Sequence, residues 1–157
     1  MSLNGWYQPK FIVNHVGLAK VNFSTDVFKW GLISGPAGDL AARSVTEGYE
    51  FVSDLLNNNG TALSEVTGGG YARQNAASVT YGLSGLVITF SMANPDWNPL
   101  TATVCYAWLH DETASSGTDA TRPLLGIFDL GGAQNPSSQP FTLDVNGSGI
   151  ATDTVTQ

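Results

Sequence analysis

The chain has 157 residues, 12% of them charged and 42% hydrophobic, and 13 acidic against six basic residues give a formal net charge of −7. A chain of this length builds one typical domain with a sizeable core. A phosphate-binding surface needs clustered lysines and arginines, so the acidic balance excludes a nucleic-acid-binding protein. No apolar run reaches the length of a membrane span, and residues 1–20 lack the charged start and continuous apolar region of a signal peptide. We therefore expect one domain over residues 1–157, made in a cytoplasm and without a membrane partner.

In chain order, residues 1–8 are expected to form an N-terminal arm, followed by a short helix over residues 9–20, where apolar residues recur at helical spacing. Residues 26–34 (DVFKWGLIS) are rich in aromatic and β-branched side chains and predict the first core strand. Residues 51–56 (FVSDLL) predict one or two helical turns that end at a run of asparagines. Short helices are thus confined to the N-terminal third.

The glycine-rich segment 65–73 (EVTGGGYAR) has the composition of a phosphate-binding loop. Such a loop is followed by a helix and usually contains a lysine, whereas the next residues, 75–81, have the pattern of a strand. A loop with backbone angles that only glycine adopts easily is therefore the prediction.

The second half of the chain predicts a series of strands separated by polar loops. The segment 122–132 (RPLLGIFDLGG) is an apolar run with Gly126 inside it, and Gly131 and Gly132 are expected to form the turn that closes it. Loops are expected at residues 111–121, an exposed and mobile tip, and at 133–140. The expected strands are residues 85–93, 101–110, 122–132, 141–145 and 150–155.

Seven or eight strand candidates at intervals of about ten to fifteen residues favour an all-β fold. We predict a single-domain β-sandwich, of Ig-like or jelly-roll type, with one or two short helices in the N-terminal third.

Catalytic chemistry has little support in the sequence. A catalytic triad needs a histidine base beside a nucleophile, and the two histidines, His15 and His110, have no nucleophile motif near them. His110 is expected to be a solvated or hydrogen-bonded residue at a strand end, and Cys105 a buried, inert thiol. We expect no catalytic residue, no cofactor and no enzyme activity.

Three acidic residues of the 111–121 loop, Asp111, Glu112 and Asp119, are expected to be solvated, with a bound cation as the alternative. Residues 144–149 match the first half of a calcium loop, but Val155 stands where the pattern needs a glutamate. No metal site is predicted, and the three carboxylates count instead as candidate contacts with a partner.

The chain contains four tryptophans and five tyrosines. Tyr106 and Trp108 alternate with smaller residues in one expected strand, so they share a face that we expect to be packed. Trp6, Tyr7 and Trp97 flank irregular segments and are the better candidates for partner contacts. A glycan-binding platform built from the aromatic residues is the alternative.

Four segments follow one another in this chain: FVSDLL, EVTGGGYARQNAASVTY, TATVCYAWLHDE, and RPLLGIFDLGG followed by PFTLDVNGSGI. Their order resembles that of motifs in a group of small virion proteins of tailed phages. The resemblance covers residues 26–150, and this chain departs from it in the insertion 57–63 and the wide loop 111–121.

The resemblance implies a non-enzymatic structural component of a virion, most simply a capsid decoration or cement protein on the outer capsid surface, made in the host cytoplasm. Its partners would be the major capsid protein or other virion proteins, together with further copies of itself as a homo-oligomer. A tail or tail-fibre protein is the alternative within the same class. From a different class, a carbohydrate-binding or adhesin-like module is the main rival, and a hydrolase the third possibility.

Overall fold

A computed structural model describes residues 6–7, 21–35, 49–56, 64–84, 87–113, 117–145 and 151–154. Eleven strands and one short helix lie within these ranges. The strands are β1 (Trp6–Tyr7), β2 (Phe28–Ser34), β3 (Ser64–Glu65), β4 (Gln74–Asn75), β5 (Thr80–Ser84), β6 (Val87–Ser91), β7 (Asp96–Leu100), β8 (Val104–Asp111), β9 (Leu124–Gln134), β10 (Gln139–Thr142) and β11 (Ala151–Thr154), and the helix is α2 (Val52–Leu56).

The strands form three sheets in which all neighbours are antiparallel. The largest has the order β1-β9-β8-β2-β3, and β4 also pairs with β2. The second sheet is the β7–β10 pair, and the third has the order β11-β6-β5. The all-β class is confirmed, whereas a sandwich of Ig-like or jelly-roll type stays a prediction.

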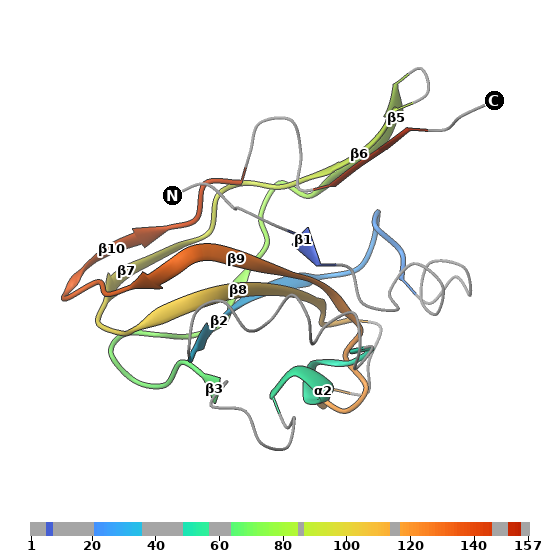
Figure 1. Ribbon diagram of the computed structural model, residues 1–157. Coiled ribbons are helices and arrows are strands. Elements are labelled where there is room, and N and C mark those ends of the chain that lie inside the picture. The colour runs from blue at the N-terminus through green and yellow to red at the C-terminus, as the bar shows by residue number, and fades with distance from the viewer. Residues whose placement is uncertain are drawn as a thin grey trace.

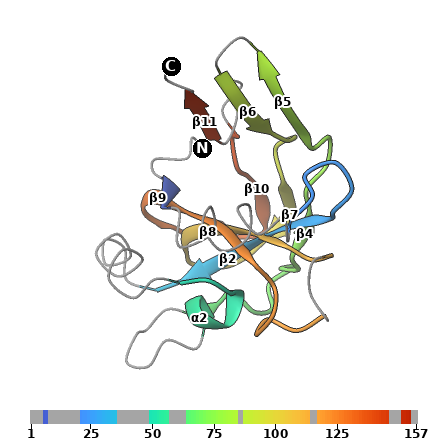
Figure 2. The ribbon, with the colours of Figure 1, turned by 90° about the vertical axis from the view of Figure 1, so that its right-hand side faces the viewer.

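The large sheet has the other elements on both of its faces. Figure 1 shows β7 and β10 on one side of it and α2 on the other, while β5, β6 and β11 form a ribbon that extends away from the body. The view turned by 90° gives the same order of layers (Figure 2). Each face of the large sheet therefore has its own apolar core.

Strand β8 lies at the centre of this arrangement, and all eight of its residues are buried. Its two faces contribute to different cores, as expected from the alternation of side chains along a strand. Ala107 and Leu109 pack in the larger core, towards β7 and β10, whereas Tyr106 and Trp108 pack in the smaller one, towards α2. The prediction that these two aromatic residues share a packed face is confirmed.

Helix α2 is short, and hydrogen bonds hold its N-terminal end in place. The Asp54 carboxylate accepts hydrogen bonds from the backbone N–H groups of Glu50 and Phe51, at 2.9 and 2.8 Å, which caps the first turn. The next two N–H groups donate outside the helix, Val52 to the Arg122 carbonyl and Ser53 to the Asp119 carbonyl. The predicted helix at 51–56 is confirmed, and it is bonded to the loop that precedes β9.

Five other predicted strands appear in the expected places with shifted ends, as β2, β6, β8, β10 and β11. The predicted strand 122–132 is β9, but Gly131 and Gly132 lie inside it rather than in a closing turn. Their φ angles are 73° and 131°, and the pairing of β8 with β9 is irregular there. The two glycines therefore form a bulge in a longer strand. The helix expected at residues 9–20 lies outside the described residues.

Two further differences concern strand boundaries. The predicted strand 75–81 is wrong as a single element, because Ser78, with a φ of 53°, lies between β4 and β5. Strand β7 was not predicted, since its Asn98-Pro99 pair reads as a break.

The glycine-rich segment is a loop, as predicted. Gly68, Gly69 and Gly70 have φ angles of 69°, 58° and 84°. A β-carbon at Gly69 or Gly70 would collide with the carbonyl oxygens of Thr101 and Pro99. The loop therefore uses its glycines to pack closely on the end of β7.

Candidate functional site

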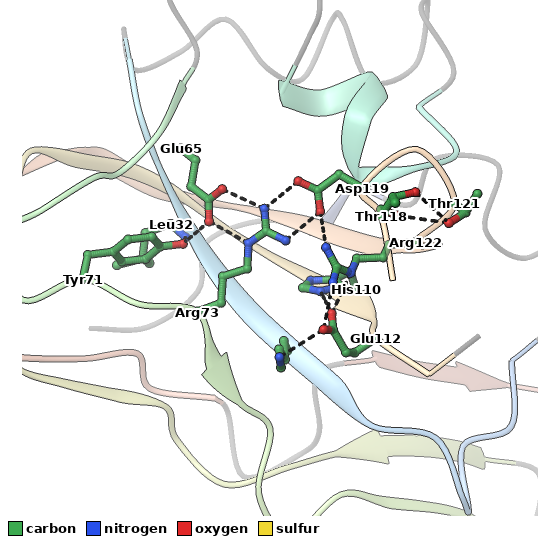
Figure 3. Close-up of polar contacts among 11 residues, drawn as sticks. Leu32, Glu65, Tyr71, Arg73, His110, Glu112, Thr118, Asp119, Thr121 and Arg122 are labelled. Atoms are coloured by element: carbon green, nitrogen blue, oxygen red, sulfur yellow. Dashed lines mark hydrogen bonds and ion pairs between the residues drawn. The ribbon is translucent and has the colours of Figure 1, made fainter. Parts of the chain in front are cut away.

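The basic side chains of the described residues gather at one place beside α2 (Figure 3). Lys29, Arg73 and Arg122 are the basic residues of the described part of the chain, and all three bind carboxylates there. We call this group the charge network (Figure 3). Its members are Lys29, Glu65, Arg73, His110, Glu112, Asp119 and Arg122.

Arg73 holds two carboxylates with one guanidinium group. Its nitrogens donate to both oxygens of Glu65, at 2.7 Å each, and to both oxygens of Asp119, at 2.7 and 2.8 Å. Burial by itself would lower the pKa of Arg73, but the hydrogen bonds to Asp119 and Glu65 raise it above its ordinary value. Bidentate contacts of this kind fix geometry as well as charge. Arg73 therefore connects the β3 end of the sheet to the loop before β9.

Tyr71 extends the network to the backbone of β2. Its hydroxyl donates to Glu65 Oε1 at 2.7 Å and accepts a hydrogen bond from the Leu32 N–H at 3.2 Å. Burial and the bond to Glu65 raise the pKa of Tyr71 well above its usual value. The phenol is thus a neutral structural link.

Arg122 joins the two carboxylates of the 111–121 segment. It donates to Asp119 Oδ1 at 2.7 Å and to Glu112 Oε1 at 2.9 Å, and Lys29 Nζ donates to the same Glu112 oxygen at 3.1 Å. Burial opposes ionisation of Glu112, but hydrogen bonds from His110 and Lys29 and the charge of Arg122 lower its pKa to about 2. The bond from Arg73 is the main cause that lowers the pKa of Asp119 to about 2.

His110 is the buried end of the network. It is fully buried, its Nε2 lies 3.0 Å from Glu112 Oε2, and its ring stacks on Trp108 with centroids 4.9 Å apart. Burial lowers its pKa to about 4, against the opposing effect of Glu112. At neutral pH the ring is uncharged, and Nε2–H donates to Glu112. Of the two outcomes expected for His110, the hydrogen-bonded one is confirmed.

The charge network pairs charged side chains with one another rather than activating a base or a nucleophile. The Nε2–H of His110 is bound to a carboxylate, and no described residue is hydrogen-bonded to its Nδ1. Cys105 is buried, as predicted, and burial raises the pKa of its thiol, which disfavours the nucleophilic thiolate. Within the described ranges, no three His, Cys, Asp or Glu side chains are grouped to hold a metal ion. No helix in the same ranges is long and apolar enough to cross a membrane.

Two of the six sequence-derived contact residues are buried. Trp97 does not flank an irregular segment, as the sequence analysis expected, but lies within β7, is 1% exposed and donates from Nε1 to the Ala72 carbonyl at 2.7 Å. Asp111 is fully buried at the end of β8, where its Oδ1 accepts a hydrogen bond from the Thr113 N–H. The expectation that these side chains are available on the surface is wrong.

The other four contact residues lie elsewhere. Glu112 and Asp119 belong to the charge network, so the expected mobile tip is anchored at both ends. Residues 114–116, between them, lie outside the described ranges. Trp6 and Tyr7 form β1, of which the structure describes the backbone pairing alone. Their role as contacts with a partner stays a prediction.

Sequence reasoning did not select Lys29, Glu65, Arg73 or Arg122. The available signal was the scarcity of basic residues, because the chain has six of them in all.

Comparisons of the chain with protein-family models, with curated proteins and with solved structures give no significant match. The functional argument therefore rests on the chain itself.

Proposed function

We propose that this protein is a non-enzymatic structural component of a phage virion, and specifically a capsid decoration protein that binds the outer capsid surface. The observation that carries the proposal is the charge network. The groups that most resemble catalytic ones, His110, Glu112 and Asp119, are bound to one another and to arginines, and they hold a loop against a sheet. Side chains used in this way favour a rigid scaffold over a reaction centre. The order of the four sequence motifs favours the same class.

The surface charge indicates what such a scaffold would bind. Six acidic residues outside the charge network are partly or fully exposed, and no basic residue of the described ranges lies outside the network. The six are Asp26, Glu50, Asp54, Asp96, Asp129 and Asp144. A surface of one sign binds best to a partner of the other sign. The capsid surface it covers is therefore expected to present lysines and arginines.

The proposal is tested on particles purified from a lysed host culture. Mass spectrometry and immunoblotting should find the protein in density-purified virions, and in tail-less heads separated from them. Imaging of the particles should then show it on the capsid at regular positions. Finding it in tails and not in heads would favour the tail-associated alternative, and its absence from washed particles would contradict the whole proposal.

The carbohydrate-binding alternative is weaker after the fold is known. Trp30, Trp97 and Trp108 are at most 1% exposed, so they offer no stacking surface, and Tyr81, at 48%, is the most exposed large aromatic of the described part. Saturable glycan binding by the isolated protein, lost on Tyr81→Ala, would reopen this alternative.

A further inference from the structure

Strand β5 is one edge of the three-stranded ribbon β11-β6-β5, which extends away from the body (Figure 1, Figure 2). Among the described segments, β6 alone pairs with it. Thr80, Tyr81 and Gly82 of this strand are all exposed. The ring of Tyr81 stacks on Phe23, with centroids 4.6 Å apart, and Phe23 packs on the larger core. Strand β5 is therefore an exposed edge that packing on the body holds in place.

The other outermost strands of the described sheets carry features that oppose pairing with another chain. Strands β1, β3 and β4 have two residues each, and β7 and β10 contain Pro99 and Pro140. The opposite edge of the ribbon, β11, contains Asp153. Short length, proline and charge are the usual devices that keep an edge strand from pairing. The five residues of β5, TYGLS, include neither a proline nor a charge.

The charge distribution favours a second copy of this chain as the partner of β5. No charged residue lies between Arg73 and Asp96, which bound the longest uncharged stretch of the sequence. Two copies that each carry a formal net charge of −7 repel each other least where their surfaces are uncharged. A basic partner would instead bind best where the acidic residues lie. The edge of β5 is therefore suited to a contact between copies.

The pairing of β5 with β6 indicates which register a second copy would use. Ser84 pairs with Val87, two residues being between them, so these two residues exchange hydrogen bonds as in a two-residue hairpin. Hydrogen-bonded and non-hydrogen-bonded pairs alternate along an antiparallel pair of strands. The backbone N–H and C=O groups of Tyr81 and Leu83 are therefore directed to the outer side of β5. A symmetric pair that uses both residues is centred on Gly82.

We infer that β5 pairs with β5 of a second copy, antiparallel and about a two-fold axis at Gly82, so that two three-stranded ribbons form one continuous sheet. Tyr81 then lies opposite Leu83 of the second copy, which pairs apolar residues. Thr80 lies opposite Ser84, which pairs hydroxyl side chains. The same strand is used on both sides, so the contact closes at two copies. The inference goes beyond the proposed function, since it concerns how copies of the chain join.

A disulfide across the two-fold axis tests this pairing. Gly82→Cys fits the monomer, because a β-carbon at Gly82 meets no atom within 4 Å and the residue has no left-handed φ. In the inferred dimer, residue 82 faces its own copy in a non-hydrogen-bonded pair, with Cα atoms about 4.5 Å apart. That separation is within the range of a disulfide. The matched control is Thr80→Cys, which is exposed on the same strand but would lie about 14 Å from its copy.

Under mild oxidation, Gly82→Cys should form disulfide-linked dimers at least tenfold faster than Thr80→Cys. The native chain should form none, because its own Cys105 is buried. Equal rates for the two variants, or no linked dimer from Gly82→Cys, would overturn the inference. Circular dichroism checks that each variant is folded.

Opposite charges at residue 82 provide a second test. Gly82→Glu and Gly82→Lys each place two like charges opposite one another in the inferred dimer, which is unfavourable. Sedimentation should show a dimer of the native chain, at least tenfold weaker dimerisation of each variant, and a mixed dimer when the two variants are combined. A native chain that is monomeric at every concentration or forms larger open assemblies, or variants that dimerise as well as the native chain, would contradict the pairing. None of these results depends on virion binding, so this inference and the proposed function fail separately.

Discussion

Gly31 of β2 lies directly opposite Trp108 of β8, and the indole ring occupies the space that a β-carbon at residue 31 would need. The guanidinium carbon of Arg73 lies 4.7 Å from the centre of the same ring. Glycine at this position thus serves close side-chain approach rather than a turn. The position of Trp108 in turn affects where Arg73 and His110 lie, so packing and charge are coupled at this point of the sheet.

Gly31→Ala should destabilise the protein by about 3 kcal/mol, since the indole must move out of a closely packed core. The free energy of unfolding in urea measures this. Gly82→Ala is the matched control, because a β-carbon there meets no atom within 4 Å. It should be neutral or slightly stabilising. Equal effects of the two substitutions would show that Trp108 adapts without cost.

Two substitutions of Arg73 should distinguish the contribution of its charge to stability from that of its bidentate hydrogen bonds. Arg73→Met removes four hydrogen bonds and leaves Glu65 and Asp119 partly buried without their shared cation. We expect a loss of about 2 kcal/mol. Arg73→Lys keeps the charge but not the bidentate fork, so it should restore less than half of that loss.

A suitable control for Arg73 is Lys29→Met, because Lys29 makes one contact with Glu112 at 3.1 Å and is more exposed. Its effect on unfolding in urea should stay below about 1 kcal/mol. If Lys29→Met costs as much as Arg73→Met, the bidentate geometry contributes nothing.

Sequence reasoning found the strands that are buried on both faces. The run that becomes β8 has no exposed position, so its apolar composition was sufficient to predict it as a strand. Strand β7 was missed because two of its five residues, Trp97 and Leu100, are buried and Pro99 interrupts the pattern. A rule that treats every proline as a break misses a strand in which the proline lies at an exposed position.

The charge network was beyond prediction for a different reason. Its contacts join residues far apart in sequence, such as Lys29 with Glu112, 83 residues away, and Arg73 with Asp119, 46 residues away. The small polar residues around Asp119 resembled a mobile tip. That segment is instead held by the bond from the Ser53 N–H to the Asp119 carbonyl, a tertiary contact with no local signal.

His110 should make stability fall as the pH drops from 6.5 to 4. Its pKa is about 4 in the folded protein, whereas an ordinary histidine has a pKa of 6.5, so in this range the unfolded chain binds the proton more readily. Stability therefore rises with pH across the window, by about 3 kcal/mol in total. His110→Phe keeps a ring on Trp108 and cannot be protonated, so urea unfolding of this variant at fixed ionic strength should show a flatter profile. An unchanged slope of unfolding free energy against pH would show that His110 does not cause the pH dependence.

Glu112 and Asp119 should affect stability at lower pH than His110 does, with an overlap between pH 4 and 4.5. Their pKa values are about 2 in the folded protein, against ordinary values of 4.5 for a glutamate and 3.8 for an aspartate. Both contribute stability above these ordinary values and lose it as the pH falls towards 2, because the unfolded chain takes up protons first. Asp119→Asn should therefore reduce the slope of unfolding free energy between pH 2 and 4.

Arg73 provides the internal control for this window, since its hydrogen bonds are the main cause of the shift at Asp119. In an Arg73→Met background, Asp119→Asn should change the slope much less than it does in the native chain. A double-mutant cycle measured at several pH values isolates that coupling. If the two substitutions were additive at every pH, the acid sensitivity would come from carboxylates outside the charge network, and the network would be a consequence of the fold rather than one of its supports.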